Sequence, residues 1–159
     1  MVNNYYGSNK DFGAAHERTA VLITNLGTPD RPVCPGLRKY LAEFLSDPRV
    51  VEFPRILWKI ILNVIIINFR SPKSAAAYRK VWTEQGSPLL VASKHLTENV
   101  NRHLGEDQQA FLAMRYGNPS IEKTLKAIHD EGYRKLIVLP MYPQYSASTS
   151  ASTFDAIAQ

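Results

Sequence analysis

The residues best suited to chemistry lie in three short segments rich in glycine, proline, tyrosine and hydroxyl side chains. These segments cover residues 27–30, 115–119 and 140–149. Each one follows a short, nearly continuous apolar run, at 20–26, 110–115 and 135–139. Such runs are typical of strands in a buried parallel sheet, and open sheets of this kind bind ligands beyond the carboxyl ends of their strands. We therefore expect the three segments to meet at one edge of a sheet.

Aromatic rings and arginines are the main binding groups that these segments and their neighbours offer. Four tyrosines can line a flat apolar slot with a polar rim, namely Tyr78, Tyr116, Tyr142 and Tyr145. Arg70 and Arg115 can hold carboxylates by bidentate hydrogen bonds. For Arg115, an ion pair with a purely structural role is the rival interpretation. The set suits a large, flat, mostly apolar molecule that carries carboxylate arms.

Several common kinds of site lack their defining residues. The chain has no Gly-x-Gly-x-x-Gly or P-loop motif after its first apolar run, and no Gly-x-Ser-x-Gly elbow. The only cysteine, Cys34, excludes an internal disulfide and a zinc site built on paired cysteines, and it indicates a reducing compartment. The four histidines fall in the N-terminal tail and on predicted helices, where packing or surface roles are expected. They are His16, His95, His103 and His129.

The charge pattern limits the choice of partners. A net charge of +5 allows anionic partners, but the lysines and arginines are scattered and are not interleaved with aromatic residues. This pattern does not favour nucleic acid as a partner. The hydrophobic fraction of 45% and the charged fraction of 21% are those of a soluble globular protein.

Helical patterns alternate with the three apolar runs. Apolar spacing, Pro-containing starts and a closing Gly132 predict helices at 35–45, 71–82, 87–104 and 119–131. Alternating strands and helices favour an α/β fold with an open, doubly wound parallel sheet. We expect a flexible N-terminal tail over residues 1–18 and one α/β lobe over 19–159.

Residues 54–69 form an unusually apolar stretch. It is shorter than the roughly 20 residues that a membrane span needs, and Lys59, Asn63 and Asn68 interrupt it. It is either a buried helix or an apolar lip that lies at an interface with Trp58 as an anchor.

An ordered series of short motifs resembles the N-terminal half of ferrochelatases of the bacterial type. These enzymes insert ferrous iron into a porphyrin. The similarity runs from about Ala20 to the last residue, and it rests on the whole set, not on any one tripeptide. The motifs are Ile23-Thr24-Asn25-Leu26-Gly27-Thr28-Pro29, Leu45-Ser46-Asp47-Pro48-Arg49-Val50-Val51, Arg70-Ser71-Pro72-Lys73 with Tyr78, Gly86-Ser87-Pro88-Leu89, Arg115-Tyr116-Gly117-Asn118-Pro119, and Leu139-Pro140-Met141-Tyr142-Pro143-Gln144-Tyr145-Ser146-Ala147-Ser148-Thr149.

The resemblance implies one lobe of a two-lobed enzyme, with the porphyrin in a cleft between the lobes and residues 54–69 as an apolar lip. Carried over by motif, six residues would bind the porphyrin: Leu26 at its face, Arg70, Tyr78 and Ser87 near the cleft mouth, and Arg115 and Tyr145 on the inner wall. In the family, a histidine and a glutamate of the second lobe handle iron and protons. We therefore expect no catalytic residue and no metal ligand in this chain, and little activity from it alone.

Further expectations come from the same resemblance. Ferrous iron is a substrate, no cofactor is bound by this lobe, and Ala147 stands where cluster-bearing ferrochelatases have a cysteine, so no iron–sulfur cluster is expected. The expected partners are the porphyrin and the second lobe, and the expected location is the cytoplasm, with peripheral contact of 54–69 to the inner membrane face. Two alternatives stay open: a non-catalytic porphyrin- or haem-binding module, and a chelatase for another tetrapyrrole and metal such as cobalt. The apolar lip argues against the latter, because those chelatases act on more polar rings.

Overall fold

A computed structural model describes residues 17–159 of the chain. The predicted N-terminal tail, 1–18, lies outside the described residues except for Glu17 and Arg18. The Arg18 guanidinium donates a hydrogen bond to the Glu131 carbonyl oxygen at 2.8 Å, and it lies 4.1 Å from the ring centroid of Tyr133. These contacts hold Arg18 against the segment that contains Glu131 and Tyr133.

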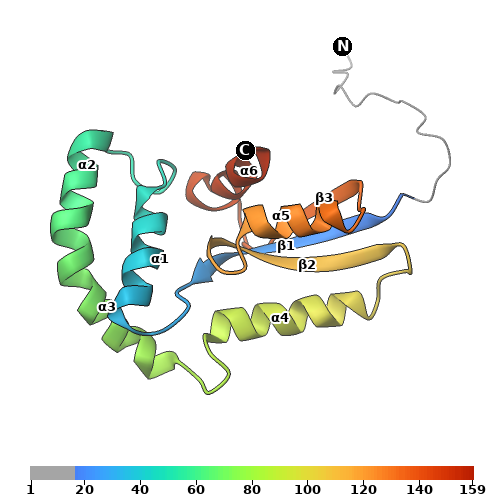
Figure 1. The fold of residues 1–159 in the computed structure, drawn as a ribbon, viewed down its shortest axis with the longest axis horizontal. Helices are drawn as coiled ribbons and strands as arrows, with labels where there is room; N and C mark the ends of the chain where they lie inside the picture. Colours follow the sequence, from blue (N-terminus) through green and yellow to red (C-terminus); the bar gives the residue numbers. More distant parts are fainter. Residues whose placement is uncertain (1–16) are drawn as a thin grey trace, which may run out of the picture.

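Three parallel strands form the sheet, in the order β2-β1-β3. The strands are β1 (Thr19–Thr28), β2 (Gln108–Gly117) and β3 (Lys135–Pro140). All three were predicted, and β1 and β2 extend beyond the predicted runs. Helix α4 (Pro88–Asn101) covers one face of the sheet, and α5 (Ile121–Asp130) and α6 (Ser152–Ala158) cover the other (Figure 1). The predicted open, doubly wound α/β fold is confirmed.

The core lies between the centre of the sheet and α5. Ala20 and Ala113 bring small side chains to the sheet, which lets the helix approach closely, and Leu22 is fully buried beside them. Ile121 and Ile128, one face of α5, complete the cluster. Each buried Leu or Ile side chain stabilises the fold by roughly 1.5–3 kcal/mol.

Strand β3 differs from its prediction as a buried strand. Leu136, Ile137 and Leu139 are 36%, 46% and 45% exposed. The reason is topological: β3 lies at an edge of the three-stranded sheet, and α6 contacts α5 and β2. An apolar run alone does not distinguish a central strand from an edge strand whose face is open.

A helical arm lies beyond the carboxyl ends of the strands. It consists of α2 (Arg55–Ile61), the π-helical segment η1 (Leu62–Ile66) and α3 (Ile67–Val81), which follow one another without a break and pack beside α1 (Cys34–Ser46) (Figure 1). No helix among residues 17–159 is long and apolar enough to cross a bilayer.

The predicted helix start at Ser71-Pro72 is wrong, because Pro72 lies inside α3. Proline costs a helix one backbone hydrogen bond. The Ser71 hydroxyl donates to the Ile67 carbonyl oxygen, and both residues are buried together with Ala75. Packing of this face beside α1 therefore outweighs the local effect of proline. The other three predicted helices correspond to α1, α4 and α5.

The carboxyl ends of β1 and β2 approach each other at two glycines. Gly27 is paired with Tyr116, and Thr28 is paired with Gly117. Gly27 has a φ of +106°, and a Cβ atom there would lie 1.8 Å from the Tyr116 carbonyl oxygen. Only glycine fits this position, so the first predicted strand-end segment is fixed against the second by backbone geometry.

Replacing Gly27 with alanine should lower the free energy of unfolding by about 3 kcal/mol, since the new methyl group meets backbone and the φ value is unfavourable for alanine. Denaturant unfolding followed by circular dichroism measures this loss. The matched control is Gly105→Ala, where no atom lies within 4 Å of the added methyl group, and it should stay within about 0.5 kcal/mol of the parent chain. Equal stabilities of the two variants would contradict the steric account.

Candidate functional site

A cavity of about 320 Å³ lies at the carboxyl end of β1, between the C-terminal part of α3 and the start of α4. Its lining comes from β1, α1, α3 and α4. The lining residues are Leu26, Gly27, Thr28, Tyr40, Tyr78, Val81, Ser87, Pro88 and Leu89. The cavity is therefore at the position that an open parallel sheet provides for ligands.

Hydroxyl groups fix the geometry of this cavity. Thr28 Oγ1 donates to Ser87 Oγ at 2.9 Å, which joins the end of β1 to the N-cap of α4. The Tyr40 hydroxyl donates to the Gly27 carbonyl oxygen at 3.3 Å. Burial, followed by the nearby phenols beginning with Tyr78, raises the pKa of Tyr40 above its ordinary value. Tyr40 is therefore a neutral donor at physiological pH and not a base.

The lining contains aromatic, aliphatic and hydroxyl side chains, with no histidine, carboxylate, lysine or arginine among its nine residues. The Tyr78 ring is supported by Trp82, at a centroid distance of 6.3 Å. Such a surface can bind a flat apolar molecule through its rings and hydroxyl groups.

The structure brings together three of the six residues that the resemblance assigns to porphyrin binding. Leu26, Tyr78 and Ser87 all line the cavity. Arg70 is exposed on α3, eight residues before Tyr78, which is about 12 Å along the helix axis. Tyr145 is 72% exposed in the segment after β3.

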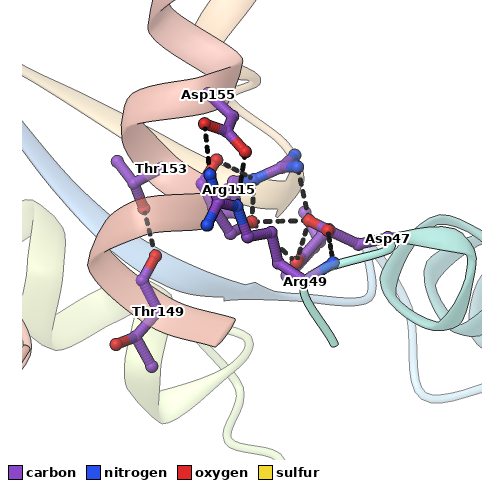
Figure 2. A network of polar contacts seen from close by, with 8 residues as sticks. Asp47, Arg49, Arg115, Thr149, Thr153 and Asp155 are labelled. Atoms are coloured by element: carbon purple, nitrogen blue, oxygen red, sulfur yellow. Dashed lines mark hydrogen bonds and ion pairs between the residues drawn. The ribbon is translucent and has the colours of Figure 1, made fainter. Parts of the chain in front are cut away.

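Arg115, the sixth residue, takes part in a buried polar network (Figure 2). Its Nη2 atom donates to Asp47 Oδ2 at 2.6 Å, and its Nε atom donates to Ser152 Oγ at 2.7 Å. Arg115 thus forms the ion pair that its rival, structural interpretation expects. A contact of Arg115 with porphyrin stays a prediction.

Asp47 is the centre of this network. Its Oδ2 atom also accepts from the Tyr116 hydroxyl at 2.7 Å and from Ser152 Oγ at 2.5 Å, and its Oδ1 atom accepts from the Arg49 backbone N–H at 2.7 Å. Burial acts to raise the pKa of Asp47. The hydrogen bonds from Ser152, Tyr116 and Arg49, with the charge of Arg115, outweigh burial and hold the pKa below its ordinary value. Asp47 is therefore an anion that ties the end of α1 to β2 and α6.

A second ion pair extends the network to the surface. Arg49 Nε lies 2.6 Å from Asp155 Oδ2, and both side chains are more than 40% exposed. Figure 2 shows this pair beside the Asp47–Arg115 pair; Asp155 lies on the same helix as Thr153, and Arg49 reaches it from the loop after α1. The exposed pair adds little stability by itself, but it holds the loop after α1 against α6.

Sequence reasoning was wrong about Tyr116 and missed two other residues. Tyr116 was predicted to line the slot, but it is fully buried with its hydroxyl on Asp47. Tyr40 fitted the apolar spacing of a helix, and nothing local indicated that its hydroxyl reaches Gly27. Asp47 was named only as a member of a family motif, and no role was predicted for it. Its partners lie about 70 and 105 positions away in the sequence. Such long-range pairing leaves no local signal.

The described part of the chain contains no candidate metal site. No group of three or more histidine, cysteine, aspartate or glutamate side chains among residues 17–159 could hold a metal ion.

Replacing Asp47 with asparagine should lower the free energy of unfolding by about 3 kcal/mol at pH 7, because Arg115 loses its buried counter-charge. The folded-state pKa of Asp47 lies below the ordinary value of 3.8, so its contribution is present above that value. The contribution is lost as the pH falls through the folded-state pKa. The difference between the parent chain and Asp47→Asn should therefore narrow below pH 3.8, as denaturant unfolding at several pH values would record.

Asp130→Asn is the control for this prediction. Asp130 pairs with Lys126 on the surface, where both side chains are more than half exposed, so its loss should have no measurable effect at pH 7. A stability difference for Asp47→Asn that stays constant from pH 7 to pH 2 would contradict the assignment of a buried anion.

Known proteins are similar to this chain over nearly all of its described residues. The family model described as ferrochelatase matches residues 18–159. The chain is 60% identical over 146 residues to a ferrochelatase of Alcanivorax borkumensis, covering 89% of this chain and 43% of that protein. It is 54% identical over 149 residues to ferrochelatase 2 of Shewanella oneidensis, covering 92% of this chain and 46% of that protein.

A third relative, the ferrochelatase of Marinobacter nauticus, is 52% identical over 162 residues, covering 99% of this chain and 42% of the relative. The chain thus spans less than half the length of the curated relatives that it matches. The family match over residues 18–159, together with the open parallel sheet and the cavity at its carboxyl edge, shows that this chain belongs to the ferrochelatase family.

Proposed function

We propose that this chain supplies one wall of the porphyrin-binding cleft of a ferrochelatase, which inserts ferrous iron into a protoporphyrin-type porphyrin in haem biosynthesis. The observation that carries the proposal is the cavity at the carboxyl end of β1. Leu26, Tyr78 and Ser87, which the resemblance assigns to porphyrin binding, all line it. The neutral, largely apolar lining matches the chemistry of a porphyrin ring.

Ring and propionates would use different parts of this surface. Leu26, Tyr78 and Val81 offer apolar and aromatic faces to the ring. Ser87 stands at the N-cap position of α4, a 14-residue helix whose dipole favours a carboxylate at that end. Arg70, exposed on α3, would hold a propionate by charge-assisted hydrogen bonds.

Arg115 and Tyr145 are proposed for the inner wall. The network on Asp47 and Ser152 uses Nε and Nη2 of Arg115, while Nη1 donates no hydrogen bond to any residue of the described range 17–159. The side chain of Arg115 is 19% exposed. Asp47 would then hold the guanidinium in place for a ligand while neutralising part of its charge.

Iron insertion needs more than this wall. Two pyrrole protons must leave, and a bent ring admits the metal more easily than a flat one, so a wall that favours the bent ring lowers the barrier. None of the nine cavity residues is a histidine, an aspartate or a glutamate. We propose that this segment binds and shapes the porphyrin, while iron and proton handling reside in the second lobe that the resemblance implies.

The same observation favours a second candidate, a module that holds porphyrin or haem without chemistry. The two candidates differ in whether the bound porphyrin is metallated once the second lobe is supplied. Ferrous iron added anaerobically to the complex of this chain alone should leave the porphyrin unmetallated under either candidate. Metallation that begins only after a second lobe is added would favour the enzyme.

Titration of the chain with protoporphyrin, followed by the Soret absorbance, tests the proposed function. The parent chain should shift the Soret band. Arg70→Ala should weaken binding about tenfold or more, because a charge-assisted hydrogen bond contributes about 1.5–3 kcal/mol.

Two controls sharpen this titration. The dimethyl ester of the porphyrin has no carboxylate, so Arg70→Ala should leave its affinity unchanged. Arg38→Ala removes an exposed arginine from α1 and should not affect either ligand. A chain that produces no Soret shift would refute the proposed binding wall, and equal effects of Arg70→Ala on diacid and diester would refute the propionate contact.

A further inference from the structure

Two buried hydroxyl groups meet in the cavity where the end of β1 approaches the start of α4. Thr28 and Ser87 are 3% and 4% exposed, and both line the cavity. Thr28 Oγ1 donates its proton to Ser87 Oγ at 2.9 Å. The direction of this bond determines what Ser87 has left to offer a ligand, because a hydroxyl group carries one proton and two acceptor lone pairs.

Ser87 occupies the N-cap position of α4 without acting as a side-chain cap. A serine at this position usually accepts a hydrogen bond from a backbone N–H of the first turn. Here its side chain accepts no such bond. Only its backbone carbonyl oxygen serves the helix, by accepting from the Val91 N–H at 3.0 Å. Within residues 17–159, the Ser87 hydroxyl is therefore engaged by Thr28 alone.

A tight turn before α4 holds Ser87 in this position. Thr83 and Gly86 exchange backbone hydrogen bonds at 3.0 and 3.1 Å, and the Thr83 hydroxyl donates to the Gly86 carbonyl oxygen at 2.9 Å. Gly86 has a φ of +115°, which residues with a side chain rarely adopt. Pro88 then begins α4 with its fixed φ. Ser87 thus lies between two residues with constrained backbones.

A second hydroxyl group joins β1 to α4 outside the cavity. Asn25 Nδ2 donates to Ser93 Oγ at 3.3 Å, and Ser93 is 5% exposed. Ser93 follows Ser87 by six residues, about 9 Å along the helix axis, and it is not among the cavity-lining residues. The strand and the helix therefore have one hydroxyl contact inside the cavity and another outside it.

The start of α4 has hydrogen-bond donors without acceptors. The Ser87 proton is one of them, because Ser87 Oγ accepts from Thr28 and its own proton reaches no acceptor within residues 17–159. The backbone N–H groups of Leu89 and Leu90 are two more, since the N–H of Val91 is the first that bonds to the helix. Leu89 lines the cavity together with Ser87. A buried donor of this kind favours a ligand that supplies an acceptor.

We infer that Thr28 is a positioning residue that makes Ser87 a hydrogen-bond donor and so selects an ionised carboxylate arm on the bound ring. The inference rests on the proposed function, in which this cavity receives a porphyrin. While Thr28 donates to Ser87, the Ser87 proton is left for another acceptor. An ionised carboxylate only accepts, and its hydrogen bonds are stronger than those of neutral acceptors. Thr28 acts on the ligand through Ser87 and need not touch it.

Titrations of the full 159-residue chain with two porphyrins in the same neutral detergent test the inference, followed by the Soret absorbance. Protoporphyrin has carboxylate arms, and etioporphyrin has alkyl groups only. Thr28→Val keeps the shape of the side chain and removes the hydroxyl group. It should weaken protoporphyrin binding about fivefold and leave etioporphyrin binding within about twofold of the parent chain. Thr28→Ser restores the donor and should bind protoporphyrin within about twofold of the parent chain.

A double-mutant cycle tests whether Thr28 acts through Ser87. Ser87→Ala should weaken protoporphyrin binding about tenfold, and Thr28→Val added to it should cause no further loss. Ser93→Ala is the matched control, because it removes the other hydroxyl group that joins β1 to α4. It should leave both affinities within about twofold of the parent chain. Circular dichroism and etioporphyrin binding report whether each variant is folded.

Equal losses of the two porphyrins in Thr28→Val would overturn the inference, since Thr28 would then support the wall without selecting a carboxylate. Unchanged protoporphyrin binding by Ser87→Ala would also overturn it, and this result does not require Thr28→Val to fold. Either outcome leaves the proposed function intact when the parent chain binds protoporphyrin. A parent chain that binds neither porphyrin overturns the proposed function together with the inference.

Discussion

A nearly fully buried aspartate joins the helical part of this chain to its sheet. Asp47 follows α1 directly and accepts hydrogen bonds from the side chains of Arg115, Tyr116 and Ser152. A buried carboxylate costs several kcal/mol unless nearly all of its acceptor positions are filled, so these partners tolerate little displacement. The ion pair fixes the end of α1 relative to β2 and α6, and other contacts depend on that position.

The cavity is one of these dependent features. Helix α1 carries Tyr40, whose hydroxyl reaches the Gly27 carbonyl oxygen at the end of β1, and it supports the buried side of α3, which carries Tyr78. Gly27 lets the same strand end lie against Tyr116. One wall of the cavity is therefore held from two directions, by backbone contact within the sheet and by the anion at the far end of α1.

Local patterns were sufficient for much of this structure. Apolar runs predicted all three strands, and the Ser87-Pro88 start predicted α4, because strand propensity and the preference of proline for the first helical turn act within a few residues of the chain. Local patterns gave wrong predictions where contacts between residues far apart in the sequence determine the structure. Pro72 was assigned to a helix start, but packing beside α1 carries α3 through it. Leu136 in β3 was assigned to the core, but edge position leaves it exposed. Three of six predicted binding residues meet in the cavity, while the partners of Arg115 could not be read from any local pattern.

The central claim is that the end of β1, the end of α3 and the start of α4 form one face that receives a porphyrin ring. Ring-current shifts in a methyl-resolved NMR spectrum test it most directly, since a porphyrin displaces the resonances of methyl groups that lie against it. Addition of protoporphyrin should shift the methyl resonances of Leu26, Val81 and Leu89, which line the cavity. Leu136 and Leu139, exposed on β3, should not shift. Large shifts on β3 with none at the cavity would contradict the account.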